Sequence, residues 1–182
     1  MLDVARLSIR NEHIFISLNP NTFLDRILEN LNGVAANQLM SVRCLVNLMV
    51  HNTGRQNILL QLEKIVKFLK NIQTGSINLQ LAIATFYLNL SVAQVNEADK
   101  LRCLLIAEGV LDLLKWSADL ETSYRSLQAL GNLSCTTFGQ MVYNQIMSAG
   151  YGMDKICDLA TARHQIGFEK VNECANSLIA KF

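Results

Sequence analysis

The 182-residue chain has little of what marks several common classes of protein. It contains one proline, and charged residues make up only 17% of it, whereas hydrophobic residues make up 51%. Disordered and linker-rich chains are polar and rich in charge, so this composition predicts one folded domain with a continuous core. The formal net charge of +1 argues against a domain whose main task is nucleic-acid binding, because that affinity comes from many lysine and arginine contacts.

Long apolar runs and paired cysteines are also missing. The longest apolar stretch, about residues 79–92, contains Gln80 and Asn89 and falls short of the ~20 residues that a membrane span requires. We therefore expect a soluble protein. Its expected compartment is the cytoplasm, and also the nucleus. The five cysteines include no C-x-x-C pair, which predicts reduced, buried thiols at Cys44, Cys103, Cys135, Cys157 and Cys174.

Catalytic and metal-binding motifs are absent from the sequence. It has no G-x-S-x-G turn, no glycine-rich phosphate loop and no H-E-x-x-H pair. Cys44 and His51 are seven residues apart, about 10.5 Å along a helix axis, which is too far for a nucleophile and its base. We expect neither an enzyme nor a resident metal or cofactor.

What the chain does have is one short pattern that returns. An asparagine inside an apolar helical stretch recurs at Asn47, Asn89, Asn132 and, more faintly, Asn176, at intervals of 42, 43 and 44 residues. A period of about 40–47 residues with helical patterning is typical of armadillo and HEAT repeats. The sequence thus predicts an all-α fold, a right-handed α-α superhelix of about four armadillo-like repeats over residues 1–182.

Helical spacing of apolar residues, broken by short turn signals, runs through the chain. It predicts helices at 2–11, 22–32, 37–52, 56–72, 77–94, 99–116, 120–137, 139–148, 151–162 and 168–181, with Asn21 or Thr22 capping the second. We also expect four aromatic residues in the core or at its edge: Trp116, Tyr87, Tyr124 and Tyr143. The first helix looks like the tail of an inner helix with no polar cap before it. We therefore expect the chain to lack the first helices of its domain.

Polar residues form stripes on the helices expected to line the inner groove. Residues three or four apart share a helix face, so each stripe points one way. The candidate groove residues are Arg43, Asn47, Thr85, Asn89, Arg125, Gln128 and Asn132. Gly131 lies in the last stripe, where a helical glycine costs about 1 kcal/mol relative to alanine and is tolerable if something approaches the backbone closely.

Two interpretations of these stripes stay open. In the functional one, the asparagine amides bind the main chain of an extended peptide and the arginines pair with its carboxylates. In the structural one, each asparagine bonds a neighbouring helix and each arginine is solvated. Acidic residues such as Glu63, Asp112 and Glu121 are expected on other elements, which would leave the groove positively charged.

Four stretches together resemble the PUL domain, the armadillo-like module of the phospholipase A-2-activating protein family. They are LDVARLSIR at 2–10, ANQLMSVR at 36–43, LAIAT at 81–85 followed by Leu88-Asn89, and DLETSYR at 119–125 followed by ALGNL at 129–133. The likeness runs over nearly the whole chain in the family's order, and Arg43 and Arg125 stand where the family's groove arginines fall.

The resemblance implies a non-catalytic domain that binds the C-terminal tail of the hexameric AAA ATPase valosin-containing protein in a positively charged concave groove. It also implies a parent chain that binds ubiquitin through other modules and acts in ubiquitin-dependent protein turnover and sorting. The alternative is an armadillo-type scaffold or transport receptor for other extended peptides. A groove for basic peptides would carry acidic residues beside the asparagines, whereas this one is flanked by Arg43 and Arg125.

Overall fold

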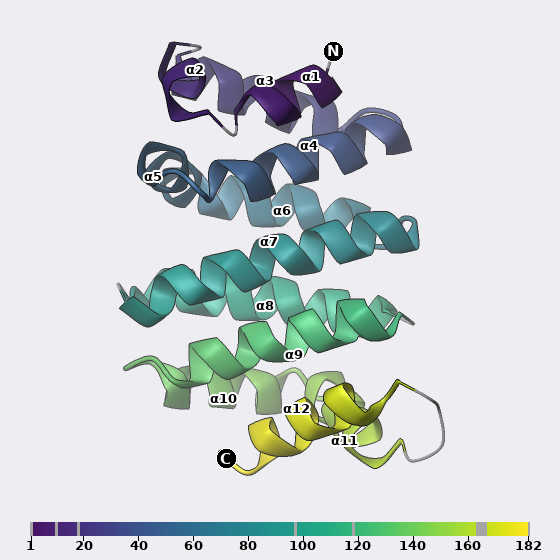
Figure 1. Cartoon of the computed structure of the whole chain (residues 1–182). Coiled ribbons are helices and arrows are strands. Elements are labelled where there is room, and N and C mark those ends of the chain that lie inside the picture. Colours follow the sequence, from purple (N-terminus) through teal and green to yellow (C-terminus); the bar gives the residue numbers. More distant parts are fainter. Residues whose placement is uncertain are drawn as a thin grey trace. The chain divides into compact units, whose positions relative to one another are not determined.

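The computed structural model describes residues 2–9, 11–17, 19–96, 98–117, 119–162 and 167–181. Over these residues the chain forms helices and no strand (Figure 1), which confirms the expected all-α, armadillo-like class. The chain divides into two compact units, residues 1–86 and residues 87–182. The division falls inside one continuous helix, α7 (Ile77–Asn96).

The first unit is built around α3 and α4. Besides the beginning of α7, its helices are α1 (Leu2–Ser8), α2 (Glu12–Ser17), α3 (Pro20–Leu31), α4 (Ala35–Leu48), α5 (Asn52–Leu60) and α6 (Leu62–Ile72). Helix α4 packs against α1, α3 and α5, and α3 also packs against α5 and α6. The core consists of aliphatic residues at helical spacing, such as Leu24, Ile27, Leu28, Leu31, Leu45, Leu48, Ile65 and Leu69.

The second unit is centred on α8 and α9. After the end of α7 come α8 (Lys100–Trp116), α9 (Leu120–Ser134), α10 (Gly139–Ser148), α11 (Tyr151–Thr161) and α12 (Glu169–Ile179). Helix α8 packs against α9, α10 and α11, whereas α12 packs against both α9 and α11. Because α12 bridges two helices, the last part of the chain is fixed to the helix that carries Arg125 and Asn132.

Caps and close turns set the helix ends. The Asp99 and Asp119 side chains accept hydrogen bonds from the backbone N–H groups of Arg102 and Thr122, at 2.9 and 2.8 Å, and so satisfy donors that a helix start leaves open. At Gly54 and Gly139 a side chain would collide with a backbone carbonyl at the end of the preceding helix. The turns that follow α4 and α9 therefore require glycine.

Several expected boundaries differ from the structure. The single helix expected at 56–72 is two helices, which meet at Gln61 with φ −111° and ψ 16°. The sequence has no glycine or proline at this point. The break between the two helices therefore follows from the packing of both α5 and α6 against α3. Helix α3 begins at Pro20 and not after Asn21 or Thr22, because proline's fixed φ suits a first helical turn. Helix α2 was not expected as a separate element.

Burial corrects two other expectations. None of the five cysteines, all in the described part of the chain, forms a disulfide, and Cys44 and Cys103 are buried as expected. The prediction is wrong for Cys135 and Cys157, which are exposed, and for Cys174, which is half-buried. Cys135 is the residue directly after the end of α9, and Cys174 lines a groove.

Trp116 is also not a core residue. It is 51% exposed at the last position of α8, whereas Tyr87 is fully buried. Within the described ranges, no helix combines the length and the apolar character needed to cross a membrane.

Candidate functional site

The polar stripe of the first unit lies on α4 and just beyond it. The Asn47 side chain donates a hydrogen bond from Nδ2 to the carbonyl of Arg6 at 2.8 Å, and His51 Nε2 lies 2.8 Å from the carbonyl of Ile9. Because a carbonyl only accepts, the imidazole is the donor in this bond. Helix α1 ends at Ser8, and the last carbonyls of a helix lack partners within it. Asn47 and His51 therefore cap the end of α1.

Arg43 lies one turn before Asn47 on the same face of α4 and is half-buried. In the part of the chain that the structure describes, it forms no hydrogen bond or ion pair. Its five N–H donors remain available for a ligand.

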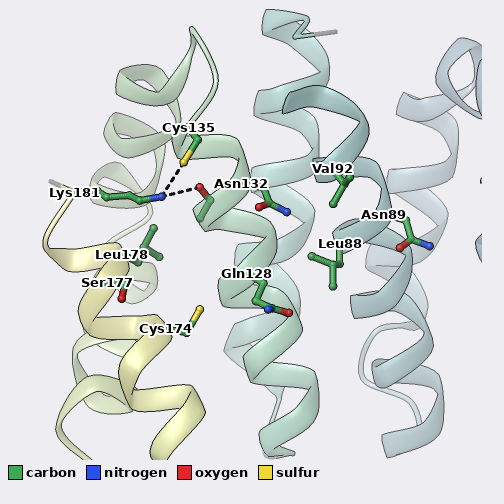
Figure 2. A pocket seen from close by; sticks show the side chains of 11 residues that line it. Leu88, Asn89, Val92, Gln128, Asn132, Cys135, Cys174, Ser177, Leu178 and Lys181 are labelled. Atoms are coloured by element: carbon green, nitrogen blue, oxygen red, sulfur yellow. Dashed lines mark hydrogen bonds between the residues drawn. The ribbon is translucent and has the colours of Figure 1, made fainter. Parts of the chain in front are cut away.

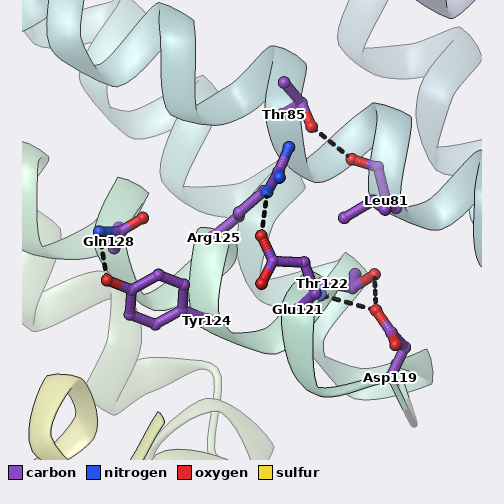
Figure 3. Close-up of polar contacts among 8 residues, drawn as sticks. All are labelled: Leu81, Thr85, Asp119, Glu121, Thr122, Tyr124, Arg125 and Gln128. Carbon is purple, nitrogen blue, oxygen red and sulfur yellow. Dashed lines mark hydrogen bonds and ion pairs between the residues drawn. The ribbon is translucent and has the colours of Figure 1, made fainter. Parts of the chain in front are cut away.

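Thr85, the candidate on α7 within the first unit, uses its hydroxyl locally. The Oγ1 hydroxyl donates to the carbonyl of Leu81 at 2.7 Å, one turn earlier in the same helix (Figure 3). The hydroxyl proton of Thr85 is therefore used inside α7, and the side chain is not a donor pointed at a ligand.

In the second unit, α7, α9 and α12 enclose a groove with a volume of about 470 Å³, shown in Figure 2. We call it the α9 groove. It brings together three of the candidate residues, Asn89, Gln128 and Asn132. Its other lining residues are Leu88, Val92, Gly131, Cys135, Cys174, Ser177, Leu178 and Lys181.

The three candidate amides of the α9 groove are engaged to different degrees. Asn132 Nδ2 donates to Ser91 Oγ at 3.1 Å, and Gln128 Nε2 donates to the Tyr124 hydroxyl at 3.0 Å. No hydrogen bond joins the Asn89 side chain to any other described residue. Nothing lies within 4 Å of the position where a side chain on Gly131 would begin, so the groove is open at that point of α9.

Lys181 supplies the positive charge of the α9 groove, and it was not among the residues predicted to line a groove. Its Nζ lies 3.2 Å from the carbonyl of Gly131 and 2.8 Å from Cys135 Sγ (Figure 2). The Gly131 carbonyl is one of the last four of α9, where a cation is favoured by the helix dipole. The only sequence signal was a basic residue directly after the last helix.

Arg125 contradicts the expected distribution of charge. Its Nε forms an ion pair with Glu121 Oε1 at 2.7 Å, one turn earlier on the same helix (Figure 3). The expectation that Glu121 lies on another element is therefore wrong, because residues 121 and 125 both belong to α9. Arg125 does not line the α9 groove, and its charge is partly balanced where it stands.

The chemistry of the buried thiols is set by desolvation. Burial raises the pKa of the Cys44 thiol to about 11; the charge of Arg6 opposes this rise and that of Asp3 adds to it. Burial also raises the pKa of Cys174, an effect that the charge of Lys181 opposes. A neutral thiol is a weak nucleophile. Among the described residues, no group of three or more His, Cys, Asp or Glu side chains is placed to hold a metal ion.

Comparison with known proteins gives the family. A family model named "PUL domain" matches residues 1–176. Among curated proteins, the chain is similar to phospholipase A-2-activating protein of Xenopus laevis, with 25% identity over 188 residues that cover 98% of this chain. The aligned part is 22% of that relative, so the chain spans about a fifth of the relative's length. Since the family model covers nearly all of the sequence, the chain belongs to the PUL domain family.

Proposed function

We propose that this domain is a protein-interaction module that binds an extended, acidic peptide, the C-terminal tail of the AAA ATPase valosin-containing protein. One observation carries the proposal. The α9 groove brings together the amides of Asn89, Gln128 and Asn132 and the ammonium group of Lys181. Amides offer both donors and acceptors to a peptide main chain, and an ammonium group pairs with a carboxylate.

Each residue has a distinct part in this proposal. Asn89, which has no partner in the described chain, is the amide that bonds the peptide backbone. Asn132 donates one N–H to Ser91, and its carboxamide oxygen can accept a hydrogen bond from a peptide N–H. In the first unit, Arg43 is a separate candidate cation for an acidic ligand, because its guanidinium has no partner in the described residues. Arg125 contributes less to peptide binding than a solvated arginine would, since it already forms an ion pair with Glu121.

The identity of the peptide comes from the family resemblance and not from the groove. In this proposal the domain brings the ATPase to ubiquitin-dependent protein turnover and sorting in the cytoplasm and the nucleus. Ubiquitin is bound by other modules of the longer protein. The domain itself performs no catalysis, and its contribution is binding alone.

Calorimetry with the ATPase tail peptide tests the proposal. We expect a dissociation constant on the order of micromolar that weakens with added salt, because a short peptide loses its flexibility on docking and charge pairing is screened. Arg43→Ala should weaken binding by about tenfold, since a hydrogen bond to a charged group is worth about 1.5–3 kcal/mol. The matched control is Lys67→Ala, which removes an exposed charge from α6.

Two results would count against it. Binding of the Arg43→Ala variant with wild-type affinity, while it melts normally, would place the peptide elsewhere. The ion pair of Glu121 with Arg125 also favours a second candidate, an armadillo-type scaffold or transport receptor for other extended peptides. A lysine-rich peptide of equal length that binds more tightly than the acidic tail would select that candidate.

A further inference from the structure

The only tryptophan of the chain lies at the protein surface. Trp116 is the last residue of α8 and is 51% exposed. Burying a large aromatic side chain is among the strongest contributions to folding. Leaving half of one in water therefore gives up stability that the fold could have had.

Its neighbour Lys115 is held between two aromatic rings. The Lys115 ammonium nitrogen lies 5.2 Å from the centroid of the Trp116 ring and 5.0 Å from the centroid of the Tyr151 ring. These distances fall within the ~6 Å over which a cation is attracted to an aromatic face. Lys115, Trp116 and Tyr151 form what we call the α8–α11 cluster.

Tyr151 fixes the second ring of the α8–α11 cluster. It is the first residue of α11, 37% exposed, and its hydroxyl donates a hydrogen bond to Asp112 Oδ1 on α8 at 2.7 Å. Because α8 and α11 also pack against each other, the ring has little freedom to move. The ammonium group is thus presented to solvent in a set position, and within the described chain it has no ion-pair partner.

These features are those of a protein-binding surface. Tryptophan and tyrosine are enriched among the residues that dominate interface energetics, and a charge that is already ordered loses less entropy on binding. The α8–α11 cluster uses different helices from the α9 groove, which α7, α9 and α12 line. The two surfaces can therefore be occupied by different ligands.

We infer that the α8–α11 cluster is a second docking surface, which takes an acidic segment of a partner protein. Charge complementarity selects the partner: its carboxylate pairs with the Lys115 ammonium, and an apolar side chain beside it covers the exposed face of Trp116. The Asp112 carboxylate, one turn before Lys115 on α8, accepts the Tyr151 hydroxyl. This inference does not depend on the proposed function of the α9 groove.

Trp116 provides the readout, since its fluorescence is the only indole signal of the chain. The probe is an acetylated and amidated pentapeptide of alternating aspartate and leucine, titrated to millimolar concentration into the 182-residue protein. We expect a saturable change in Trp116 emission. The matched peptide with asparagine for aspartate should bind about threefold more weakly or worse, because an exposed ion pair is worth up to about 1 kcal/mol.

Variants separate this surface from the groove. Lys115→Met keeps the length and the apolar stem of the side chain and should remove the preference for the acidic peptide, whereas Arg43→Ala should leave the titration unchanged. An emission that does not saturate, equal binding of both peptides, or an acidic preference that survives Lys115→Met would overturn the inference. A saturable response only to a single-stranded oligonucleotide or to anionic lipid vesicles would also overturn it, in favour of those ligands.

Discussion

The stripes on α4 and α9 carry similar residues and use them in opposite ways. In the first unit, Asn47 is committed to the end of α1, whereas Arg43 has no partner in the described chain. In the second unit, the arginine is the committed residue, because Arg125 pairs with Glu121. Asn132 bonds only the side chain of Ser91, beside an open groove. A shared repeat position thus fixes where a polar side chain points, and its local neighbours decide whether it is available.

The units do share one device. In each, a side chain from later in the chain contacts a backbone carbonyl at the end of an earlier helix. Asn47 and His51 do so for α1, and Lys181 does so for α9. The difference is that an amide and an imidazole bind the carbonyls in the first unit, whereas a positively charged ammonium group binds the carbonyl in the second. The second unit therefore gains a cation in its groove from an interaction that also holds the fold together.

The largest expected effect is the loss of stability at high pH that follows from the burial of Cys44 in α4. Cys44, next to Arg43, has a pKa of about 11 in the folded protein against 9.0 for an unperturbed thiol. The folded state therefore keeps its proton while the unfolded chain loses one. The free energy of unfolding should be constant below pH 9 and fall by about 2–3 kcal/mol between pH 9 and 11.

Urea denaturation at pH 7, 9 and 10.5 measures this loss, and Cys44→Ala is the control. The variant should show a shallower decline. It should keep the part due to Tyr87 in the second unit, because burial also raises the pKa of that phenol. Equal declines for the two proteins would mean that Cys44 is more hydrated than its full burial indicates.

The second effect compares the repeated asparagines directly. Asn47→Ala should lower the free energy of unfolding by about 1–2 kcal/mol, because the Arg6 carbonyl loses its donor. Asn89→Ala should cost less than about 0.5 kcal/mol, since no bond to another described residue is lost. Thermal melting of both variants checks this, and equal losses would contradict the distinction between a structural and an available asparagine.

The sequence predicted the repeat, the helical class and the family, and it left the use of each side chain undecided. The 42-to-44-residue spacing of asparagines is visible because every repeat must bury the same faces against its neighbours. Whether Asn47 bonds a backbone or a ligand depends on α1, which lies 41 residues away in sequence. The ion pair of Glu121 with Arg125 could have been predicted from the sequence, because two residues four apart on one helix lie side by side. Lys181 was not, since only tertiary packing brings it to Gly131.

The third prediction compares one glycine from each unit. Gly131→Ala should raise the free energy of unfolding by about 1 kcal/mol, because alanine favours a helix and the added methyl group meets nothing within 4 Å. The same methyl group enters the α9 groove and should weaken binding of the tail peptide. Gly54→Ala in the first unit is the control, and it should destabilise the protein because the Leu48 carbonyl occupies the space. A stabilised Gly131→Ala variant with unchanged affinity would remove this part of α9 from the peptide site.

The smallest effect asks whether Arg125 can be made to resemble Arg43. Glu121→Gln removes the negative charge at the 2.7 Å ion pair and keeps the size of the side chain. Because the pair is exposed and joins residues four apart on one helix, its loss should cost the fold only about 0.3–0.5 kcal/mol. Removal of the Glu121 carboxylate should then tighten binding of the acidic tail about two- to threefold, with a steeper dependence on salt. Calorimetry of wild type, Glu121→Gln and the Glu121→Gln/Arg125→Ala double variant resolves the contribution of the arginine. If Glu121→Gln binds the tail no better than wild type, Arg125 lies outside the peptide's path.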